Sequence, residues 1–382
     1  MTRAIALIDG EHYAPVVRDA LEALPYAFVG AIMVGGTEKL REGADYGVPL
    51  VEDFAGAEVV VDLSDEPVLG PAERFRWVSR ALAAGISYVG ADFRFDPPVF
   101  EPFPLPSIAV IGTGKRVGKT AVTAHLARLL ARDRDVVVVA MGRGGPAEPE
   151  VIEEPPGIAE LVELARSGRH AASDHLETAA IVGVTTIGCR RAGGGLAGAV
   201  FVSNVSEGAR LAAARLPDVV VFDGSGAAVP PVDVDRRVLV VGSGHDVGAY
   251  LNTYRRLISD LVVAVNCQVD GAIEVTLRLR ALDELTGRVA VFTAGATDVS
   301  HLDADVVHVS PNLADRGVLR RELAELEADT YLIEIKGAAI DIVAEHALAL
   351  GKRVVAGAND VIALDGDLDA ALLTLLDDRV PV

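Results

Sequence analysis

Residues 108–130, IAVIGTGKRVGKTAVTAHLARLL, constrain the fold of this chain more than any other stretch. We expect an apolar strand over Ile108–Ile111, a glycine-rich loop from Gly112 to Gly118, and a helix that begins at Lys119 and Thr120. Such a loop binds phosphate groups, because its backbone N–H groups and the helix N-terminus converge on one point. The stretch therefore predicts a P-loop in an α/β domain with a parallel sheet.

The loop predicts both a nucleotide site and a metal site. Lys119 is expected to reach the β- and γ-phosphates of ATP, and the Thr120 hydroxyl to ligate Mg²⁺. Gly112 precedes Gly118 by six residues, one more than in the common pattern. This spacing resembles the GT-x-x-x-VGKT loop of dethiobiotin synthetase and its relatives. The predicted nucleotide-binding residues are Gly112, Thr113, Gly114, Lys115, Arg116, Val117, Gly118, Lys119 and Thr120.

Composition narrows the class of protein. The chain has 382 residues, of which 51% are hydrophobic, and this length allows two or three domains. Its apolar runs are much shorter than the roughly 20 residues of a membrane span, and no signal-peptide pattern begins the chain. A net charge of −20 argues against non-specific binding to nucleic acid. We therefore expect a cytoplasmic protein with no membrane and no nucleic-acid partner.

Residues 1–100 are predicted to form a smaller Rossmann-like α/β domain of unknown role, because strands and helices alternate there. No G-x-G-x-x-G follows the first strand, so dinucleotide binding is unsupported. Gly35, Gly36 and Thr37 fit either an anion-binding turn or, more simply, a plain turn. Five prolines within residues 95–106 indicate a stiff linker. Residues 101–382 are then the P-loop ATP-binding catalytic domain.

Further strands of the second domain are expected at residues 135–141, 219–222, 238–241, 261–265, 289–293, 331–335 and 353–355, with a solvated acidic segment at the C-terminus. Asp223 follows the second of these strands, where a Mg²⁺ ligand or a simple turn residue belongs. Arg143 lies in a glycine-rich turn at another strand end. Arg190 and Arg191 precede glycines 193–195, a pattern that allows bidentate binding of oxyanions or forms a surface loop.

Three further positions have both a functional and a structural interpretation. His170 and His175 fit acid–base work, hydrogen bonding to phosphate, or an exposed helix start capped by Ser173 or Asp174. Lys336 fits a phosphate contact or an ordinary surface lysine. Asn266, at a strand end, is a candidate for the edge of the adenine ring.

Several segments taken together point to a family. GTGKRVGKT, AMGRGGP, HAASDH, TTIGCRRAGGG, FVSNV and FDGSGAAVPP occur in this order and resemble the cyclic 2,3-diphosphoglycerate synthetase family. The resemblance extends from about Gly90 to Asp341. It implies an ATP-dependent ligase that joins the two phosphates of 2,3-diphosphoglycerate into a cyclic anhydride and releases ADP and phosphate.

The resemblance also implies roles for individual residues. The implied catalytic residues are Lys115, Lys119, Asp223, His170 and His175. The implied substrate-binding residues are Arg143, Arg190, Arg191 and Lys336, and the implied metal ligands are Thr120 and Asp223. The cofactors are ATP and Mg²⁺, with K⁺ as a further candidate, and the substrate is a small polyanion. Because P-loop proteins of this group are often dimers, we expect a homodimer.

Two alternatives stay open at this point. A 2-phosphoglycerate kinase would use the same loop and the same arginines, and only the products would separate it from a cyclising enzyme. A P-loop nucleotide-dependent regulator or metallochaperone is the second alternative. It is disfavoured because Cys189 and Cys267 form no metal-ligand pattern.

Overall fold

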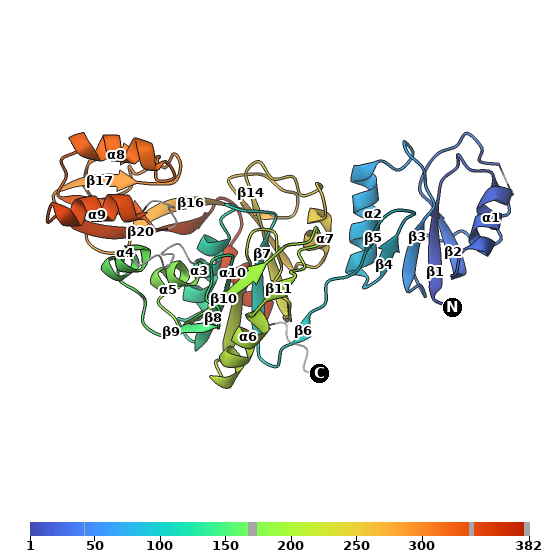
Figure 1. Ribbon diagram of the computed structural model, residues 1–382, viewed down its shortest axis with the longest axis horizontal. Helices are drawn as coiled ribbons and strands as arrows, with labels where there is room; N and C mark the ends of the chain where they lie inside the picture. The colour runs from blue at the N-terminus through green and yellow to red at the C-terminus, as the bar shows by residue number, and fades with distance from the viewer. Residues whose placement is uncertain (42, 167–173, 336–339, 378–382) are drawn as a thin grey trace. The chain divides into compact units, whose positions relative to one another are not determined.

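The computed structural model describes residues 1–41, 43–166, 174–335 and 340–377, and it divides into two compact units (Figure 1). The first unit contains Met1–Val99 together with Leu196–Gly198 and Asp246–Ile258, and the second contains the remainder. The two short segments come from the part of the sequence assigned above to the catalytic domain. Each unit has its own sheet.

The first unit is a small α/β sheet with helices on both faces. Its strand order is β2 (Ala27–Met33), β1 (Arg3–Ile8), β3 (Val59–Asp62), β4 (Ser87–Val89) and β5 (Arg94–Phe95), and only the β4–β5 pair is antiparallel. Its helices are α1 (Ala14–Ala23), α2 (Pro71–Ala83) and α7 (Asn252–Leu257).

Alternation along β1 explains the two layers of helices. Ile5 and Leu7 pack into a core that includes Val78 of α2, whereas Ala6 and Ile8 pack into a core that includes Val17 of α1. Successive side chains of a strand point to opposite faces, so a strand that is buried throughout needs cover on both sides. The Rossmann-like prediction agrees with this mixed α/β arrangement.

The second unit has a thirteen-stranded, mostly parallel sheet. Its order is β11 (Val202–Ser203), β10 (Thr186–Ala192), β8 (Val136–Gly142), β12 (Val219–Asp223), β7 (Ser107–Gly112), β14 (Arg236–Gly242), β15 (Leu261–Val265), β16 (Ile273–Ala281), β20 (Arg353–Ala363), β19 (Thr330–Glu334), β17 (Arg288–Phe292) and β18 (Asp305–Ser310), and β9 (Glu150–Ile152) pairs with β10. β6 (Glu101–Pro102) and β13 (Val232–Asp233) form a separate parallel pair. All six residues of β7 are buried, as expected for a strand between two parallel neighbours.

Among the described residues, two of the hydrophobic cores on this sheet pack helices against its strands. One core joins α3 (Lys119–Leu130) to β7, β8 and β12 and also includes residues of α4 (Ile158–Arg166), α5 (Asp174–Val182) and α10 (Leu368–Asp377). The other core joins α8 (Arg316–Glu325) and α9 (Ile340–Ala349) to β17 and β19 (Figure 1). α6 (Val205–Ala214) lies beside β8 and β10.

The structure differs from the sequence-based expectations in several segments. β16 was not predicted, and the last strand continues to Ala363, because these two strands pair with each other over seven residues. The acidic C-terminal segment contains helix α10, which buries Leu368 and Leu372 on one face. Arg190 and Arg191 lie on strand β10. The proline-rich linker contains β6, which pairs with β13.

Candidate active site

The glycine-rich loop connects β7 to α3, as the sequence predicted. Gly118 caps the helix with φ of 94°, a left-handed conformation that glycine adopts without strain. A Cβ on Gly112 would approach the Lys119 side chain to 2.8 Å, and one on Gly114 would approach the His245 ring to 2.3 Å. The glycines therefore let two side chains pack directly on the loop backbone.

Lys119 is nearly buried and donates a hydrogen bond from Nζ to the carbonyl oxygen of Gly114, at 2.7 Å. Lys115 and Arg116 are exposed and form no ion pair or hydrogen bond with any described residue. The loop thus carries one cation held by its own backbone and two that remain available to an anion.

Asp223 ends β12, directly beside the P-loop strand. Its side chain is 3% exposed, and its Oδ1 accepts a hydrogen bond from the Thr123 hydroxyl on α3, at 3.0 Å. The following Gly224 donates its N–H to the carbonyl of Val110 in β7, at 2.9 Å. These bonds hold the carboxylate at the edge of the sheet where the P-loop begins.

A cavity of about 870 Å³ opens over this loop, and we call it the P-loop cavity. Its lining brings together much of the predicted site: Lys115, Arg116, Val117, Gly118, Lys119, Thr120, Arg143 and Asp223, with Asn266 also present. Gly112, Thr113 and Gly114 lie outside the lining. Thr120 and Asp223 therefore share one cavity with several cations, an arrangement that fits Mg²⁺ bound through few protein oxygens together with nucleotide phosphates.

The three predicted arginines have different environments. Arg143 lines the P-loop cavity, is exposed, and forms no ion pair or hydrogen bond with any described residue. Arg191 donates hydrogen bonds to the carbonyl oxygens of Gly193 and Ser225, both at 2.8 Å. Because Ser225 lines the cavity, Arg191 holds part of the cavity wall. Arg190 is exposed and lies outside the lining.

The structure does not bring His175 to the P-loop cavity. This histidine is 3% exposed and packs against Gly188 of β10, where a Cβ would meet the imidazole at 2.3 Å. Its Nε2 lies 3.4 Å from a carboxylate oxygen of Glu150. The imidazole therefore fills space behind β10, a packing role that the sequence pattern did not reveal. His170 and Lys336, and the proposed cap Ser173, lie outside the described residues.

The far wall of the P-loop cavity was missed by sequence analysis. It is built by β16, by the loop after β17, by the end of β19 and by the middle of β20. Glu334 accepts hydrogen bonds from the Ala294 N–H at 2.8 Å and from the Asn359 side-chain amide at 2.7 Å. No motif marks these residues, because they come together only through long-range strand pairing.

Neither cysteine has the properties of a nucleophile. Burial, with a smaller contribution from Glu207, raises the pKa of the Cys189 thiol to about 12. Burial, followed by the charge of Glu274, also raises the pKa of Cys267. A nucleophilic cysteine needs a lowered pKa, so both thiols stay protonated at neutral pH. The chemistry of the site falls instead to its cations, its carboxylate and the loop backbone.

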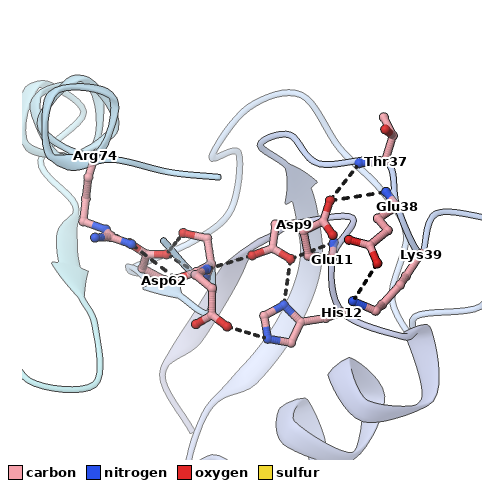
Figure 2. Close-up of polar contacts among 10 residues, drawn as sticks. Asp9, Glu11, His12, Thr37, Glu38, Lys39, Asp62 and Arg74 are labelled. Atoms are coloured by element: carbon pink, nitrogen blue, oxygen red, sulfur yellow. Dashed lines mark hydrogen bonds and ion pairs between the residues drawn. The ribbon is translucent and has the colours of Figure 1, made fainter. Parts of the chain in front are cut away.

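In the first unit, the turn at Gly35, Gly36 and Thr37 was considered above as an anion site. A carboxylate of the protein, that of Glu11, binds at this turn. The Oε1 of Glu11 accepts hydrogen bonds from the backbone N–H groups of Thr37 at 3.2 Å and Glu38 at 3.3 Å (Figure 2). These bonds contribute to a lowered pKa of Glu11. The turn thus binds an internal carboxylate.

Across the described ranges, no group of three or more His, Cys, Asp or Glu side chains is arranged to hold a metal ion. Mg²⁺ at a phosphate site usually binds through one or two carboxylates together with phosphate and water oxygens. Among the same residues, none of the helices combines the length and the apolar character needed to cross a bilayer.

Comparison with known proteins gives matches along nearly the whole chain. Residues 3–96, 107–290 and 291–360 match the N-terminal, P-loop and C-terminal domains described for cyclic 2,3-diphosphoglycerate synthetase. The chain is 49% identical to the cyclic 2,3-diphosphoglycerate synthetase of Rubrobacter xylanophilus, and the match covers 98% of this chain and 97% of that protein. Proteins of the same name from Methanothermus fervidus and Pyrococcus furiosus are 36% and 37% identical, over 98% and 97% of this chain and 97% of each relative.

Among solved structures, the chain is similar to LpxK from Aquifex aeolicus in complex with ATP, with a TM-score of 0.43 and 15% identity. That similarity covers 73% of this chain and 90% of the other.

Proposed function

Because the chain belongs to the cyclic 2,3-diphosphoglycerate synthetase family, we propose that it converts 2,3-diphosphoglycerate and ATP into the cyclic anhydride, ADP and phosphate. The observation that carries the proposal is the P-loop cavity, in which Lys119 and Asp223 share a lining with three cations that have no partner among the described residues: Lys115, Arg116 and Arg143. A substrate with two phosphates on adjacent carbons needs such concentrated positive charge. The chain as a whole carries a charge of −20, so these cations are local.

The reaction divides into two displacements. In the first, an oxygen of one substrate phosphate attacks the γ-phosphorus of ATP, the bond to the bridging β–γ oxygen breaks, and ADP leaves. In the second, an oxygen of the neighbouring substrate phosphate attacks the phosphorus of the activated phosphate. The bond to the added phosphoryl group then breaks, and inorganic phosphate leaves as the ring closes.

The residues have distinct roles in this scheme. Lys119 and Lys115 neutralise negative charge on the transferring phosphoryl group, the kind of electrostatic stabilisation that dominates such reactions. Arg143 binds a substrate phosphate, and Arg116, which lines the same cavity, is a further candidate for this contact. Arg191 acts through the Ser225 loop that it holds. We do not extend the acid–base role to His175, because its ring packs behind β10.

Thr120 and Asp223 are the residues that would hold Mg²⁺, which would offset phosphate charge when bound. We extend the proposal to K⁺ as an additional cation and to a homodimeric assembly. A cytoplasmic location fits an enzyme that draws on ATP. The substrate-binding roles of Arg190 and Lys336 and the catalytic role of His170 remain predictions.

Phosphorus NMR of the purified protein with ATP, Mg²⁺, K⁺ and 2,3-diphosphoglycerate tests the proposal. We expect a new pair of anhydride resonances together with ADP and phosphate, and none with the Lys119→Ala variant. The names of the relatives favour this outcome over the kinase and over the regulator. Formation of diphosphoglycerate from 2-phosphoglycerate without any anhydride would identify a kinase and overturn the proposal, as would the absence of any product.

A further inference from the structure

The lining of the P-loop cavity gathers its cations in one group of residues, beside the carboxylate of Asp223. Lys115, Arg116 and Arg143 line the side that includes the P-loop. The lining residues from β16, β19, β20 and the loop after β17, which we call the far wall, include no cation and present carboxylates and neutral polar groups, among them Glu334 and Asn359. Phosphate groups are repelled by carboxylates at close range, so the far wall suits the uncharged part of a ligand. If the phosphates of ATP lie on the P-loop, that part is the nucleoside.

Asn359 has a fixed orientation on this wall. Its Nδ2 donates a hydrogen bond to Oε1 of Glu334 at 2.7 Å, and the other oxygen of Glu334 accepts from the Ala294 N–H at 2.8 Å. Rotating the amide by 180° would place its oxygen against a carboxylate, which is repulsive because both are acceptors. Glu334 therefore determines which end of the Asn359 amide remains for a ligand.

The remaining end is a hydrogen-bond acceptor. Among the described residues, Oδ1 of Asn359 has no hydrogen-bond donor, although the side chain is half-buried and lines the cavity. Leu277 lies on the same wall, and its Cδ1 is 3.6 Å from the position that a Cβ on Gly118 would take. The Leu277 side chain offers an apolar surface for a planar base. Oδ1 of Asn359 offers an acceptor for a hydrogen-bond donor on the edge of that base.

We propose that Asn359, oriented by Glu334, selects adenine: its Oδ1 accepts a hydrogen bond from the exocyclic amine at position 6 of the purine. Hypoxanthine and guanine carry a carbonyl oxygen at that position, which would face Oδ1 as a second acceptor. A site built around one hydrogen bond discriminates strongly against an analogue that cannot form it. This inference rests on the proposed function, because it takes the nucleotide to be ATP.

The proposal changes the role of two parts of the chain. The segment 291–360, matched only as a C-terminal domain, becomes part of the nucleotide site, since it supplies Ala294, Glu334 and Asn359. Asn266, expected from sequence to contact adenine, lines the same cavity, so variants of the two asparagines separate the two assignments.

Calorimetry tests this assignment. It measures the equilibrium binding of ATP and of inosine triphosphate in the absence of 2,3-diphosphoglycerate. We expect the unaltered protein to bind ATP about 10- to 100-fold more tightly than inosine triphosphate. The Asn359→Ala variant should bind ATP about 10-fold more weakly, because one hydrogen bond is lost, and should bind inosine triphosphate unchanged.

Asn312 offers a matched control. Its side-chain amide donates to Glu322 Oε1, also at 2.7 Å, and it is half-buried, but it lies outside the P-loop cavity. Asn312→Ala should therefore leave the preference for ATP intact. Glu334→Gln provides a second test that keeps Asn359 in place: the Asn359 amide can then present either end, so the ratio of the two affinities should fall.

The assignment is overturned if the unaltered protein binds both nucleotides equally, or if Asn359→Ala keeps the preference. It is also overturned if Asn266→Ala, rather than Asn359→Ala, removes the preference. Because no acid substrate is present, the result does not depend on cyclisation. If the protein prefers ATP in the binding measurement but forms no cyclic product, only the proposed function is rejected. If it forms the cyclic product equally well with both nucleotides, only the assignment of Asn359 is rejected.

Discussion

The two units end their buried parallel strands in aspartates, yet these carboxylates have different surroundings. In the first unit, Asp9 follows β1 and Asp62 ends β3. In the second, Asp223 ends β12 beside a P-loop cavity of about 870 Å³. Carboxyl ends of parallel strands are the usual place for ligands in open α/β sheets, so both edges have the position of a site.

At the first edge, the protein binds its own carboxylates. Asp9 is fully buried and accepts hydrogen bonds from the backbone N–H groups of Asp65 at 2.7 Å and Glu11 at 3.0 Å, and His12 Nδ1 lies 2.7 Å away (Figure 2). Asp62 accepts hydrogen bonds from Arg74 and Tyr88, each at 2.8 Å.

The second edge keeps several polar groups available. Lys115, Arg116 and Arg143 have no partner among the described residues, and Asn359 has a free acceptor there. The comparison teaches that position at a strand end does not by itself make a binding site. The edge must also carry groups whose charge or hydrogen bonds the fold has not already satisfied.

Among the substitutions that compare the two edges, Lys119→Ala should have the largest effect, and this effect is on the rate of the reaction. We expect a loss of about 10³-fold in the rate of ADP release, because the cation that stabilises the transferring phosphoryl group is removed. Lys39→Ala in the first unit is the control, and it should leave the rate unchanged. Equal losses in both variants would mean that the first edge also takes part in turnover.

Replacing Asp62 by Ala should destabilise the first unit by about 3–5 kcal/mol, because it leaves Arg74 and Tyr88 without their shared buried carboxylate. Denaturant unfolding followed by hydrogen exchange of β1 and β3 measures the change. Asp96 pairs with Arg94 at the surface, so Asp96→Ala should cost less than about 1 kcal/mol. Similar costs for the two variants would contradict a structural role for the Asp62 cluster.

Replacing Arg143 by Ala should raise KM for the acid substrate about 10- to 100-fold, because a charge-assisted hydrogen bond to phosphate is lost. Steady-state kinetics at saturating ATP measure this KM. Arg190→Ala should change KM less, since Arg190 lies outside the cavity. In Arg191→Ala the effect should fall mainly on kcat, since this side chain holds the Ser225 loop. A larger KM effect for Arg190 than for Arg143 would reverse our assignment.

The smallest effect concerns acid stability. Burial opposes ionisation of Asp9, but hydrogen bonds from the Asp65 backbone, His12 and the Glu11 backbone outweigh it and lower the pKa of this carboxyl below 3.8. A lowered folded-state pKa contributes stability that is fully present above the unfolded value and is lost as pH falls through the folded value. Unfolding of the first unit should therefore become easier as pH falls below the ordinary pKa of an aspartate. An Asp9→Asn variant with an unchanged acid dependence would contradict this.

Much of the fold and part of the site could be predicted from sequence. The glycines, Lys119, Thr120 and the buried strand 108–111 specify a local backbone shape, which depends on residues close together in the chain. Asp223 was predicted for the same reason, because a buried apolar run indicates where its strand ends. The outcome for His175 was not predictable, because short polar motifs do not reveal which side of a strand a histidine packs against.

The sequence by itself determined the P-loop, the alternating strands and helices, and the family, since each depends on local spacing or on motifs in order. Only the tertiary structure decided that Arg191 holds the Ser225 loop, that the first edge satisfies its own carboxylates, and that Glu334 orients Asn359 on the cavity wall. The physical reason is that these contacts depend on pairing between distant strands, such as Leu279 of β16 with Asn359 of β20. Hydrogen bonds of this kind leave no periodic pattern in the sequence.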